Sequence, residues 1–368
     1  MRVLCRLAAL AVAAAVLMAK PGAANPVSAQ SVQAQESVSA ADVPAVPNPA
    51  PTPVLITEVL AHADLPEVDF VELHNPGAER ADVGGWFLTD EADQPRRFPI
   101  PGGTAIDPGG YLVFTQQQLG FGFSEFGERV YLYAPGTQGE LVEIDKVAFG
   151  ASPNGRSFGR LRTSSGALQF PLQQVSTRGG ANSPPWVAPI VLTEIMYQPA
   201  VGSEYLIVAN RTGLPQPLFD PERPGLRWQI DGVDFTFPPD LVLGPFTRLI
   251  VAAAEPDQFR AEHNLPAETP VLGPFNGKLN NDGERLALQQ PQPPETDGFV
   301  PYVDVDVVEY GVSSPWPAAA AGQGAALQRI APGVYGNDPT NWRAGVTDLA
   351  TVGTPAPAYS VYLPAILR

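Results

Sequence analysis

The first candidate for a chemically reactive residue is the serine in G-R-S-F-G at residues 155–159. This spacing satisfies G-x-S-x-G, the nucleophile-elbow pattern, which needs a buried strand before the serine, a helix after it, and an Asp and a His later in the chain. The residues after Ser157, R-L-R-T-S-S-G, do not form a helical pattern, and the one later histidine is His263. We therefore expect no catalytic residue here.

Two acidic stretches have the spacing of carboxylates in a calcium loop. They are T-D-E-A-D at residues 89–93 and V-D-V-D at residues 303–306. Neither continues into the D-x-D-x-D-G-x5-E arrangement of a calcium-binding loop, so we expect turns or edge strands. In the second stretch, Asp304 and Asp306 alternate with valines, as in a half-buried strand whose successive side chains point to opposite faces.

Five further side chains are candidates for ligand binding. His62 and His74 could meet across neighbouring strands, but two histidines without a third ligand are more typical of surface residues. Glu72 is the one charged side chain inside an apolar strand, and we expect it to cap a turn or to pair with an arginine. Tyr131 and Tyr133 could stack on sugar rings, although covering a sheet edge is the commoner role. The sequence predicts no metal or cofactor site and leaves the ligand-binding residues unknown.

Composition restricts the fold that must position these residues. The chain of 368 residues contains 35 glycines and 42 prolines, and neither residue suits the interior of a helix, which argues against a helical bundle. Hydrophobic residues make up 44% of the chain and charged residues 16%. This is enough apolar material for packed cores, so a wholly disordered chain is also excluded. Many short strands joined by turns remain, in two or three domains.

The charge of the chain excludes general binding to nucleic acids or anionic lipids. The formal net charge is −16, and it becomes about −19 without residues 1–29, which hold three basic side chains and no acidic one. Binding to phosphates needs an excess of cations instead. One local exception lies within residues 146–178, where Arg156, Arg160 and Arg162 occur without an acid. We expect these arginines to form a solvated edge.

The N-terminal residues are typical of an export signal. Two arginines precede an apolar run at residues 7–19, and small residues follow it. This pattern predicts a signal peptide over residues 1–29 and a secreted or cell-surface protein. The run is shorter than the roughly 20 residues that span a bilayer, and we expect no transmembrane segment in the mature chain. Cleavage would remove Cys5, the only cysteine, and residues 30–53 predict a disordered linker rich in Ala and Pro.

A regular rhythm of strands is expected from residue 54 onward. Short apolar segments, bounded by Gly, Pro, Asn or Asp, lie at residues 54–60, 69–75, 85–90, 110–115, 129–135 and 143–150. Such spacing is typical of an antiparallel sandwich or barrel. In the fifth segment, Val130 and Leu132 share one strand face, which we expect to point inward, while the two tyrosines share the other face and are partly covered.

The second half of the chain repeats the first half in the same order. V-L-T-E-I-M-Y at 191–197 echoes L-I-T-E-V-L-A at 55–61, and Trp228 takes the place of Trp86. Further matched segments lie at residues 204–213, 235–238, 244–252, 283–288 and 305–311. Seven matches in one order indicate an internal duplication. An insertion at residues 255–265 has a proline, Pro256, at a suitable first helical position and predicts a short helix.

These segments resemble the lamin tail domain family. The first copy resembles it over nearly its whole length, about residues 54–182, and the features that carry the resemblance are F-V-E-L-H-N at 70–75, G-W-F-L at 85–88 and F-P-I-P-G-G-T-A-I-D-P-G-G-Y at 98–111. The second copy, about residues 190–356, resembles a more divergent version. It has Ile207 where the first copy has Glu72, and the first copy has Arg178 where the family usually has a proline.

The resemblance implies an all-β chain with two tandem immunoglobulin-like β-sandwich domains that are not catalytic. The expected organisation is a signal peptide at 1–29, a linker at 30–53, a sandwich at 54–182, a linker at 183–189, a sandwich at 190–356 and an apolar tail at 357–368. We expect each copy to fold alone, because about 130 residues can bury roughly two-thirds of their unfolded surface. Trp86 and Trp228 are the predicted core anchors.

Two functions remain open at this point. The favoured one is a non-enzymatic, exported structural or adhesive protein that presents both sandwiches for surface attachment or macromolecular interaction, including protein–protein contacts. The alternative is a carbohydrate- or polymer-binding accessory protein of an extracellular hydrolase. The sequence does not name the partner, which we expect to be an extracellular macromolecule or a cell-surface component. The final residues, 359–368, predict either an edge strand docked on the second sandwich or a surface-retention tag.

Overall fold

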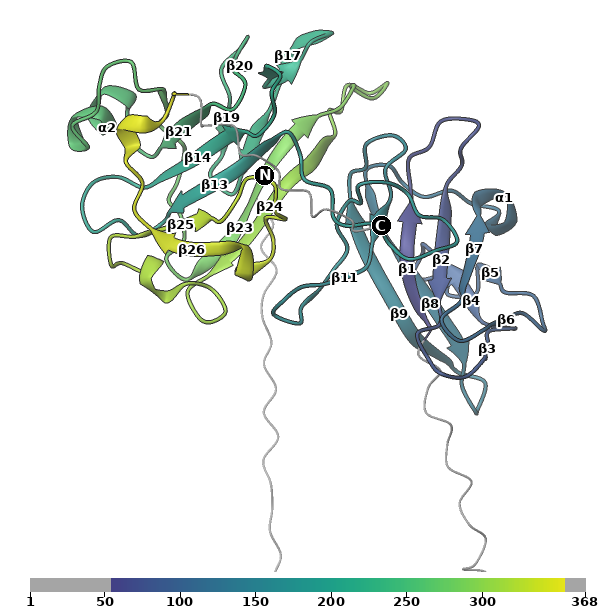
Figure 1. The fold of residues 1–368 in the computed structure, drawn as a ribbon. Helices are drawn as coiled ribbons and strands as arrows, with labels where there is room; N and C mark the ends of the chain where they lie inside the picture. The colour runs from purple at the N-terminus through teal and green to yellow at the C-terminus, as the bar shows by residue number, and fades with distance from the viewer. Residues whose placement is uncertain (1–53, 355–368) are drawn as a thin grey trace, which may run out of the picture. The chain divides into compact units, whose positions relative to one another are not determined.

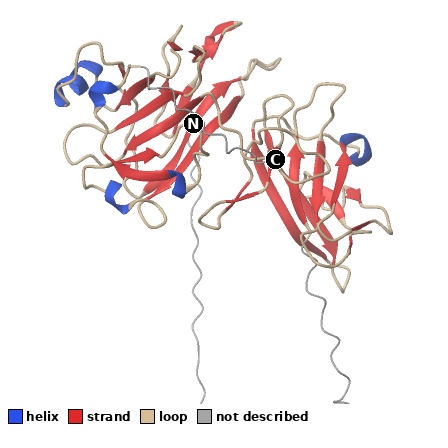
Figure 2. Cartoon of the chain, viewed as in Figure 1, coloured by secondary structure: helices blue, strands red, loops and turns tan. Residues whose placement is uncertain are grey.

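The structure of the chain is a computed structural model that describes residues 54–354, and its regular secondary structure is mostly β-strand, with a few short helices and many loops (Figure 1; Figure 2). The expected signal peptide, the linker at 30–53 and the tail at 357–368 lie outside the described residues. Within the described range, no helix is long and apolar enough to cross a membrane. The strands form two β-sandwiches that follow each other along the chain.

The first sandwich is built from two four-stranded antiparallel sheets. One sheet contains, in spatial order, β10 (Phe158–Gly159), β1 (Leu55–Leu60), β2 (Phe70–His74) and β7 (Tyr111–Thr115). The other contains β5 (Phe98–Pro99), β4 (Phe87–Thr89), β8 (Gly127–Pro135) and β9 (Leu141–Gly150). Shorter elements complete it: β3 (Ala81–Asp82) paired with β6 (Ala105–Ile106), β11 (Leu161–Arg162) paired with β12 (Leu168–Gln169), and helix α1 (Gln116–Leu119).

The second sandwich has a six-stranded and a four-stranded sheet. The larger sheet contains, in spatial order, β22 (Val271–Leu272), β21 (Arg248–Ala252), β14 (Tyr205–Asn210), β13 (Ile190–Met196), β25 (Ala326–Arg329) and β26 (Trp342–Gly345). The smaller sheet contains β19 (Phe235–Thr236), β18 (Gln229–Asp231), β23 (Gly283–Pro291) and β24 (Tyr302–Gly311). Two short pairs are β15 (Gln216–Pro217) with β20 (Val242–Leu243), and β16 (Phe219–Asp220) with β17 (Arg223–Arg227).

The strand order of the first sandwich recurs in the second. The order β10–β1–β2–β7 corresponds to β25–β13–β14–β21, and β5–β4–β8–β9 corresponds to β19–β18–β23–β24. The irregularities recur as well, because the register shift between Ile56 and Glu58 in β1 has its counterpart between Leu192 and Glu194 in β13. The matched sequence segments therefore occupy corresponding places in two all-β, immunoglobulin-like sandwiches.

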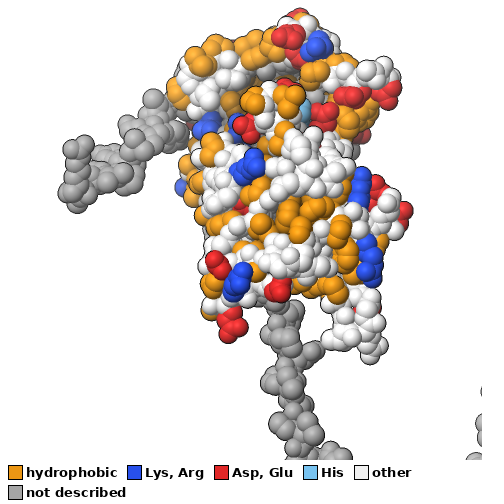
Figure 3. Space-filling view, turned by 90° about the vertical axis from the view of Figure 1, so that its right-hand side faces the viewer, with side chains coloured by type: hydrophobic (Ala, Val, Ile, Leu, Met, Phe, Trp, Pro, Cys, Tyr) orange, Lys and Arg blue, Asp and Glu red, His pale blue; other side chains and the backbone are white. Residues whose placement is uncertain are grey.

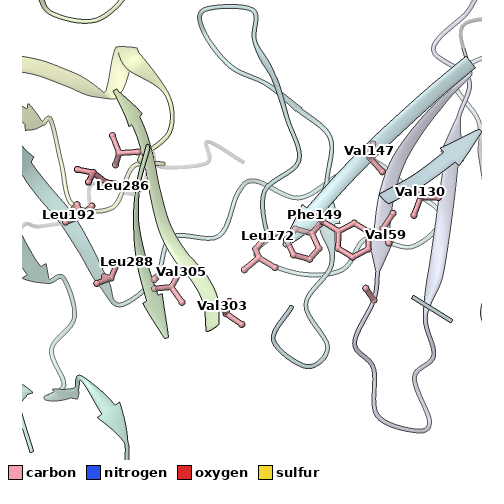
Figure 4. Packing of buried hydrophobic residues seen from close by; sticks show 14 of the residues in the cluster. Val59, Val130, Val147, Phe149, Leu172, Leu192, Leu286, Leu288, Val303 and Val305 are labelled. Atoms are coloured by element: carbon pink, nitrogen blue, oxygen red, sulfur yellow. The ribbon is translucent and has the colours of Figure 1, made fainter. Parts of the chain in front are cut away.

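Each core lies between the two sheets of its own sandwich. Val130 and Leu132 are fully buried, as the alternation in β8 predicts, and Val59 from the facing sheet lies in the same hydrophobic cluster (Figure 4). Trp86 and Trp228 are likewise buried in their own copies. Full burial of such side chains contributes roughly 1.5–3 kcal/mol each, so these inward-facing positions hold the two sheets together.

The second sandwich carries an additional hydrophobic layer on its larger sheet. Helix α2 (Pro256–Glu262) begins at the predicted proline, and its Phe259 is fully buried against the outer side of the sheet, beside Tyr205 and Ile207. Three 3-10 helices, η1 (Ala318–Ala320), η2 (Pro339–Asn341) and η3 (Leu349–Thr351), lie in the later loops. Leu349 of η3 belongs to the same outer cluster, so this face of the second sandwich is closed by apolar side chains.

Candidate functional site

A half-buried aspartate–arginine pair ties the two sheets of the first sandwich together. Asp145 of β9 accepts the backbone N–H of Ile56 in β1 at 2.7 Å and forms an ion pair with Arg160. Arg160 also donates from its Nε to the carbonyl of Ile56 at 2.7 Å. Burial raises the pKa of Asp145, and the Arg160 guanidinium acts in the opposite direction. The pair therefore satisfies the backbone groups that the bulge in β1 leaves free, which is a structural role.

The same arrangement recurs in the second sandwich and is more deeply buried there. Asp306 of β24 accepts the N–H of Leu192 at 2.8 Å and pairs with Arg329 at 2.7 Å, and the Arg329 side chain is fully buried. Arg329 donates to the carbonyl of Leu192 at 2.9 Å. Desolvation raises the pKa of Asp306, and Arg329 counteracts it.

Two expectations from the sequence are corrected by these contacts. Arg156 and Arg160 are not a solvated edge, because Arg156 lies 4.4 Å over the ring of Trp186 and Arg160 is held by Asp145. Arg162 is exposed, as expected. Asp306 does not share a face with Asp304, because a register shift in β24 turns Asp306 into the interior while Asp304 contacts Arg285 outside. A strict period-two alternation therefore fails at this bulge.

A pair of buried glutamates lies on the outer face of the β1–β2 sheet in the first sandwich. Glu58 and Glu72 are register partners on neighbouring strands, and both are fully buried. Residues 176–180 cover them: Ser176 and Thr177 donate to Glu58 at 2.8–3.0 Å, and the N–H of Gly179 donates to Glu72. Of the two expected partners of Glu72, the turn is the one observed.

Burial changes the titration of the Glu72 carboxyl group. Desolvation raises its pKa to about 7, the N–H of Gly179 lowers it, and the nearby Glu58 raises it further. One of its oxygens, Oε1, is buried without a hydrogen-bond partner among the described residues. The group is therefore an unusually placed acid whose charge changes near neutral pH.

The second sandwich has different side-chain contacts at the positions that correspond to Glu58 and Glu72. Glu194 stands where Glu58 stands, and it accepts the hydroxyl of Tyr205 at 2.7 Å and the amide of Gln328 at 3.2 Å. Ile207 occupies the position of Glu72 and packs into the apolar outer cluster. Only the first sandwich therefore has two carboxylates side by side on this face.

Ser157 lies in a structural position. Its side chain is fully buried, its Oγ accepts a hydrogen bond from Gln173 at 3.3 Å, and the short strand β10 follows it rather than a helix. The strand–turn–helix geometry of a nucleophile elbow is therefore not formed at this serine.

The histidines and the first acidic stretch contact other groups. His62 lies 2.8 Å from the carbonyl of Ser152 and 3.0 Å from Glu125, while His74 stacks on Tyr111 with ring centroids 4.4 Å apart. Within residues 89–93, Asp90 and Glu91 both pair with Arg97 in a turn. Residues 54–354 contain no group of three or more His, Cys, Asp or Glu side chains placed to hold a metal ion.

An aromatic row lies on the outer face of the β4–β8–β9 sheet in the first sandwich. Tyr131 and Tyr133 of β8 have nearly parallel rings with centroids 6.0 Å apart. Phe87 of β4 lies directly opposite Tyr133, and Lys146 of β9 lies opposite Tyr131, so all four side chains share one face. The two tyrosines are partly exposed, as expected.

Basic side chains border this aromatic row. The guanidinium of Arg96 lies 5.2 Å from the centre of the Phe87 ring, and Arg129 precedes the two tyrosines on the same face of β8. One acidic side chain lies on this face as well: Glu143 of β9 is opposite Tyr133 and pairs with Lys146 at 2.9 Å. We call Phe87, Arg96, Arg129, Tyr131, Tyr133 and Lys146 the aromatic face.

The equivalent face of the second sandwich is polar and neutralised. Arg285 takes the place of Arg129 and contacts Asp231, Asp304 and Glu309. Ala287, which replaces Tyr131, is fully buried. Gln289, which replaces Tyr133, bonds to Gln229 at 2.7 Å. The two copies therefore differ in both apolar and charge character at one position of the fold.

A shallow cleft of about 430 Å³ is found in the second sandwich, lined by Tyr197, Gln198, Glu204 and Lys278, among others. Gly277 is one of its lining residues. The cleft has Lys278 and Glu204 as opposite charges along its wall, but nothing indicates a particular ligand.

Sequence reasoning missed Glu58, Glu194 and both aspartate–arginine pairs. A signal for them existed, because the glutamate of T-E and the aspartate of I-D-K and V-D-V recur at matched places of the two copies. Phe87 could not be found in this way, since the second copy has Gln229 there. Its role depends on a cross-strand neighbour that the sequence does not specify.

The geometry defines a chain of immunoglobulin-like β-sandwiches, and comparison with known proteins refines this class for the first copy. Residues 47–151 match the family model of the Lamin Tail Domain, a family of non-catalytic immunoglobulin-like modules. The matched segment covers less than a third of the chain and includes Glu58, Glu72 and the aromatic face. The likeness of the second copy rests on its repeated strand order. No curated protein and no solved structure matches the chain significantly.

Proposed function

We propose that this chain is an exported, non-enzymatic protein that uses its sandwich modules for surface attachment or macromolecular interaction. The observation that carries the proposal is the contrast between interior and surface. The two copies repeat their internal ion pair and bulge, whereas their outer faces differ in both charge and apolar character. A repeated scaffold with divergent faces fits a protein whose surfaces bind and whose interior only supports them.

The buried polar groups support a structural interior. Asp145, Asp306 and Glu194 are each held by two or more hydrogen bonds from the chain itself. A catalytic acid or base needs a free position within hydrogen-bond reach of a substrate. The hydrogen bonds of these three carboxylates instead hold strands and loops in place.

A second candidate function is a carbohydrate- or polymer-binding accessory protein of an extracellular hydrolase. The aromatic face favours it, because Tyr131 and Tyr133 form a partly exposed row beside Phe87. Tyrosine rings offer an apolar surface to the C–H groups of sugars and a hydroxyl to their oxygens.

The proposal is tested by sedimenting the protein with fragments of cell envelope and with insoluble extracellular polymers. We expect saturable co-sedimentation with at least one of these materials, together with recovery from the medium or wall fraction of the producing cells. Soluble protein in every mixture and retention inside the cells would contradict the proposal. Hydrolysis of p-nitrophenyl acetate that disappears in Ser157→Ala would contradict its non-enzymatic part.

A further inference from the structure

The aromatic face carries basic side chains that the rest of this acidic protein does not neutralise. The chain has a net charge of −16, yet Arg96 and Arg129 have no carboxylate within ion-pair distance among the described residues. On the side of the molecule drawn in Figure 3, acidic and basic side chains are mixed with hydrophobic ones. A face with two unpaired arginines is therefore a local exception that suits an anionic ligand.

The same position in the second sandwich serves as an internal reference. Arg285 corresponds to Arg129 on the matching strand, and Asp231 and Asp304 contact it at ion-pair distance. If the arginine only stabilised the strand, we would expect both copies to supply carboxylates for it. In the first copy, Arg129 is exposed, Tyr131 follows it on the same face of β8, and no carboxylate among the described residues lies within ion-pair distance of Arg129.

The aromatic side chains add a stacking surface to these charges. Among the hydrogen bonds of residues 54–354, none involves the hydroxyl of Tyr131 or of Tyr133, so both can bond to a ligand. Partial burial, and then the neighbouring Glu143, raise the pKa of Tyr133 above its ordinary value. Two phenol hydroxyls beside arginines match a ligand that has both hydroxyl and carboxylate groups.

We propose that the aromatic face of the first sandwich binds an acidic extracellular polysaccharide, a polymer of uronic-acid type. This inference rests on the proposed binding function and names the ligand class and the binding face. The sugar rings pack on Tyr131 and Tyr133, and carboxylates pair with Arg129 and Arg96. Arginine binds a carboxylate through two parallel hydrogen bonds, which gives this face its preference for acidic over neutral sugars.

The geometry favours a polysaccharide over a nucleic acid. The face is an open row along β8, and side chains two residues apart on a strand are separated by roughly 6.5–7 Å, which suits successive units of an extended polymer. Duplex DNA carries about one charge per 1.7 Å and requires many cations to bind. Three basic side chains, one of them paired with Glu143, match the lower charge density of a polymer with one carboxylate per sugar.

The inference is tested by isothermal titration of the chain without residues 1–29 with an oligogalacturonate. The probe should bind at low salt, and binding should weaken at high salt because exposed charges are screened. In Arg129→Ala and in the double variant Tyr131→Ala/Tyr133→Ala, we expect affinity to fall about tenfold or more. The matched control is Arg285→Ala, which removes the corresponding cation of the second sandwich and should leave affinity unchanged. Circular dichroism verifies that each variant is folded.

Four outcomes would overturn the inference. A neutral cello-oligosaccharide of equal length could bind as tightly, the variants of the first sandwich could bind like the unaltered chain, or a single-stranded DNA could bind more tightly than the oligogalacturonate. Absence of oligogalacturonate binding would also overturn it. Sedimentation with envelope fragments, measured on the same protein, separates the two proposals: if it persists, only the acidic-polysaccharide assignment fails, and if it is also absent, the proposed function fails as well.

Discussion

The first and second sandwiches tie their sheets together with the same aspartate–arginine pair but cover the outer faces of those sheets in different ways. In the first, a loop with Gly179 closes over two glutamates; in the second, α2 and an apolar cluster close over Ile207. The facing sheets differ too, with tyrosines in one copy and neutralised polar side chains in the other. After duplication, the constraint of packing applies to the interior, while each outer face is free to acquire its own role.

The tryptophans provide the largest test of the shared interior. Because Trp86 and Trp228 occupy matching buried positions, Trp86→Ala and Trp228→Ala should each lower the free energy of unfolding of their own sandwich by about 3–5 kcal/mol. Calorimetry of the whole chain measures both. A large loss of unfolding free energy in one copy and none in the other would contradict an equivalent role of the two tryptophans.

The ion pairs should show a graded difference between the copies. Removing one partner of a buried pair leaves the other charge uncompensated, so Arg329→Met should cost about 3–4 kcal/mol. Arg160→Met should cost less, since the side chains of Arg160 and Asp145 retain 14% and 12% of their exposure, against 0% and 4% for Arg329 and Asp306. Urea unfolding measures both variants, and equal losses would contradict the graded burial. The double variant Arg329→Met/Asp306→Leu should recover part of the stability.

The sequence is enough to predict the strands and their repetition, because apolar alternation and turn residues are local signals. It places Val130, Leu132 and the helix at Pro256 correctly. It fails at Asp306, where a bulge interrupts the alternation, and at Arg160, whose partner lies on another strand. The aromatic face could be predicted only in part, since Tyr131 and Tyr133 are visible in one segment but their neighbours depend on strand pairing.

Glu72 provides a pH-dependent difference between the copies. Its folded-state pKa of about 7 lies above the ordinary value of 4.5, so its contribution to stability is fully present below about pH 4.5 and is lost as pH rises through 7. The shift corresponds to about 3 kcal/mol. Urea midpoints between pH 4 and pH 8 should therefore fall less steeply in Glu72→Gln than in the unaltered chain. Identical slopes would show that Glu72 does not titrate in this range.

The matched variant is Glu72→Ile, which gives the first sandwich the residue type that the second sandwich has at this position, Ile207. It removes the titration as Glu72→Gln does, but it also removes the acceptor for the N–H of Gly179. We therefore expect faster amide exchange in residues 176–180 for Glu72→Ile only. Equal exchange in the two variants would contradict the role of the carboxyl group in holding this loop.

Among these variants, the one that removes the hydroxyl of Tyr205 should lower the free energy of unfolding the least. The first sandwich has Phe70 at this position, and Tyr205→Phe removes the 2.7 Å bond to Glu194 while Gln328 remains a donor. We expect a loss of about 1–2 kcal/mol in the second sandwich, measured by urea unfolding. A loss as large as that of Arg329→Met would show that Glu194 depends on Tyr205 alone.

The two sandwiches share an interior arrangement but present different outer faces. Hydrogen–deuterium exchange of the chain, with and without oligogalacturonate, tests this difference directly. We expect slower exchange on ligand addition in the β4 and β8–β9 segments of the first sandwich, residues 87–89 and 127–150. In the matching β18 and β23–β24 segments of the second sandwich, residues 229–231 and 283–311, we expect unchanged exchange. Equal protection of both copies, or protection of the second alone, would contradict the divergence of the two outer faces.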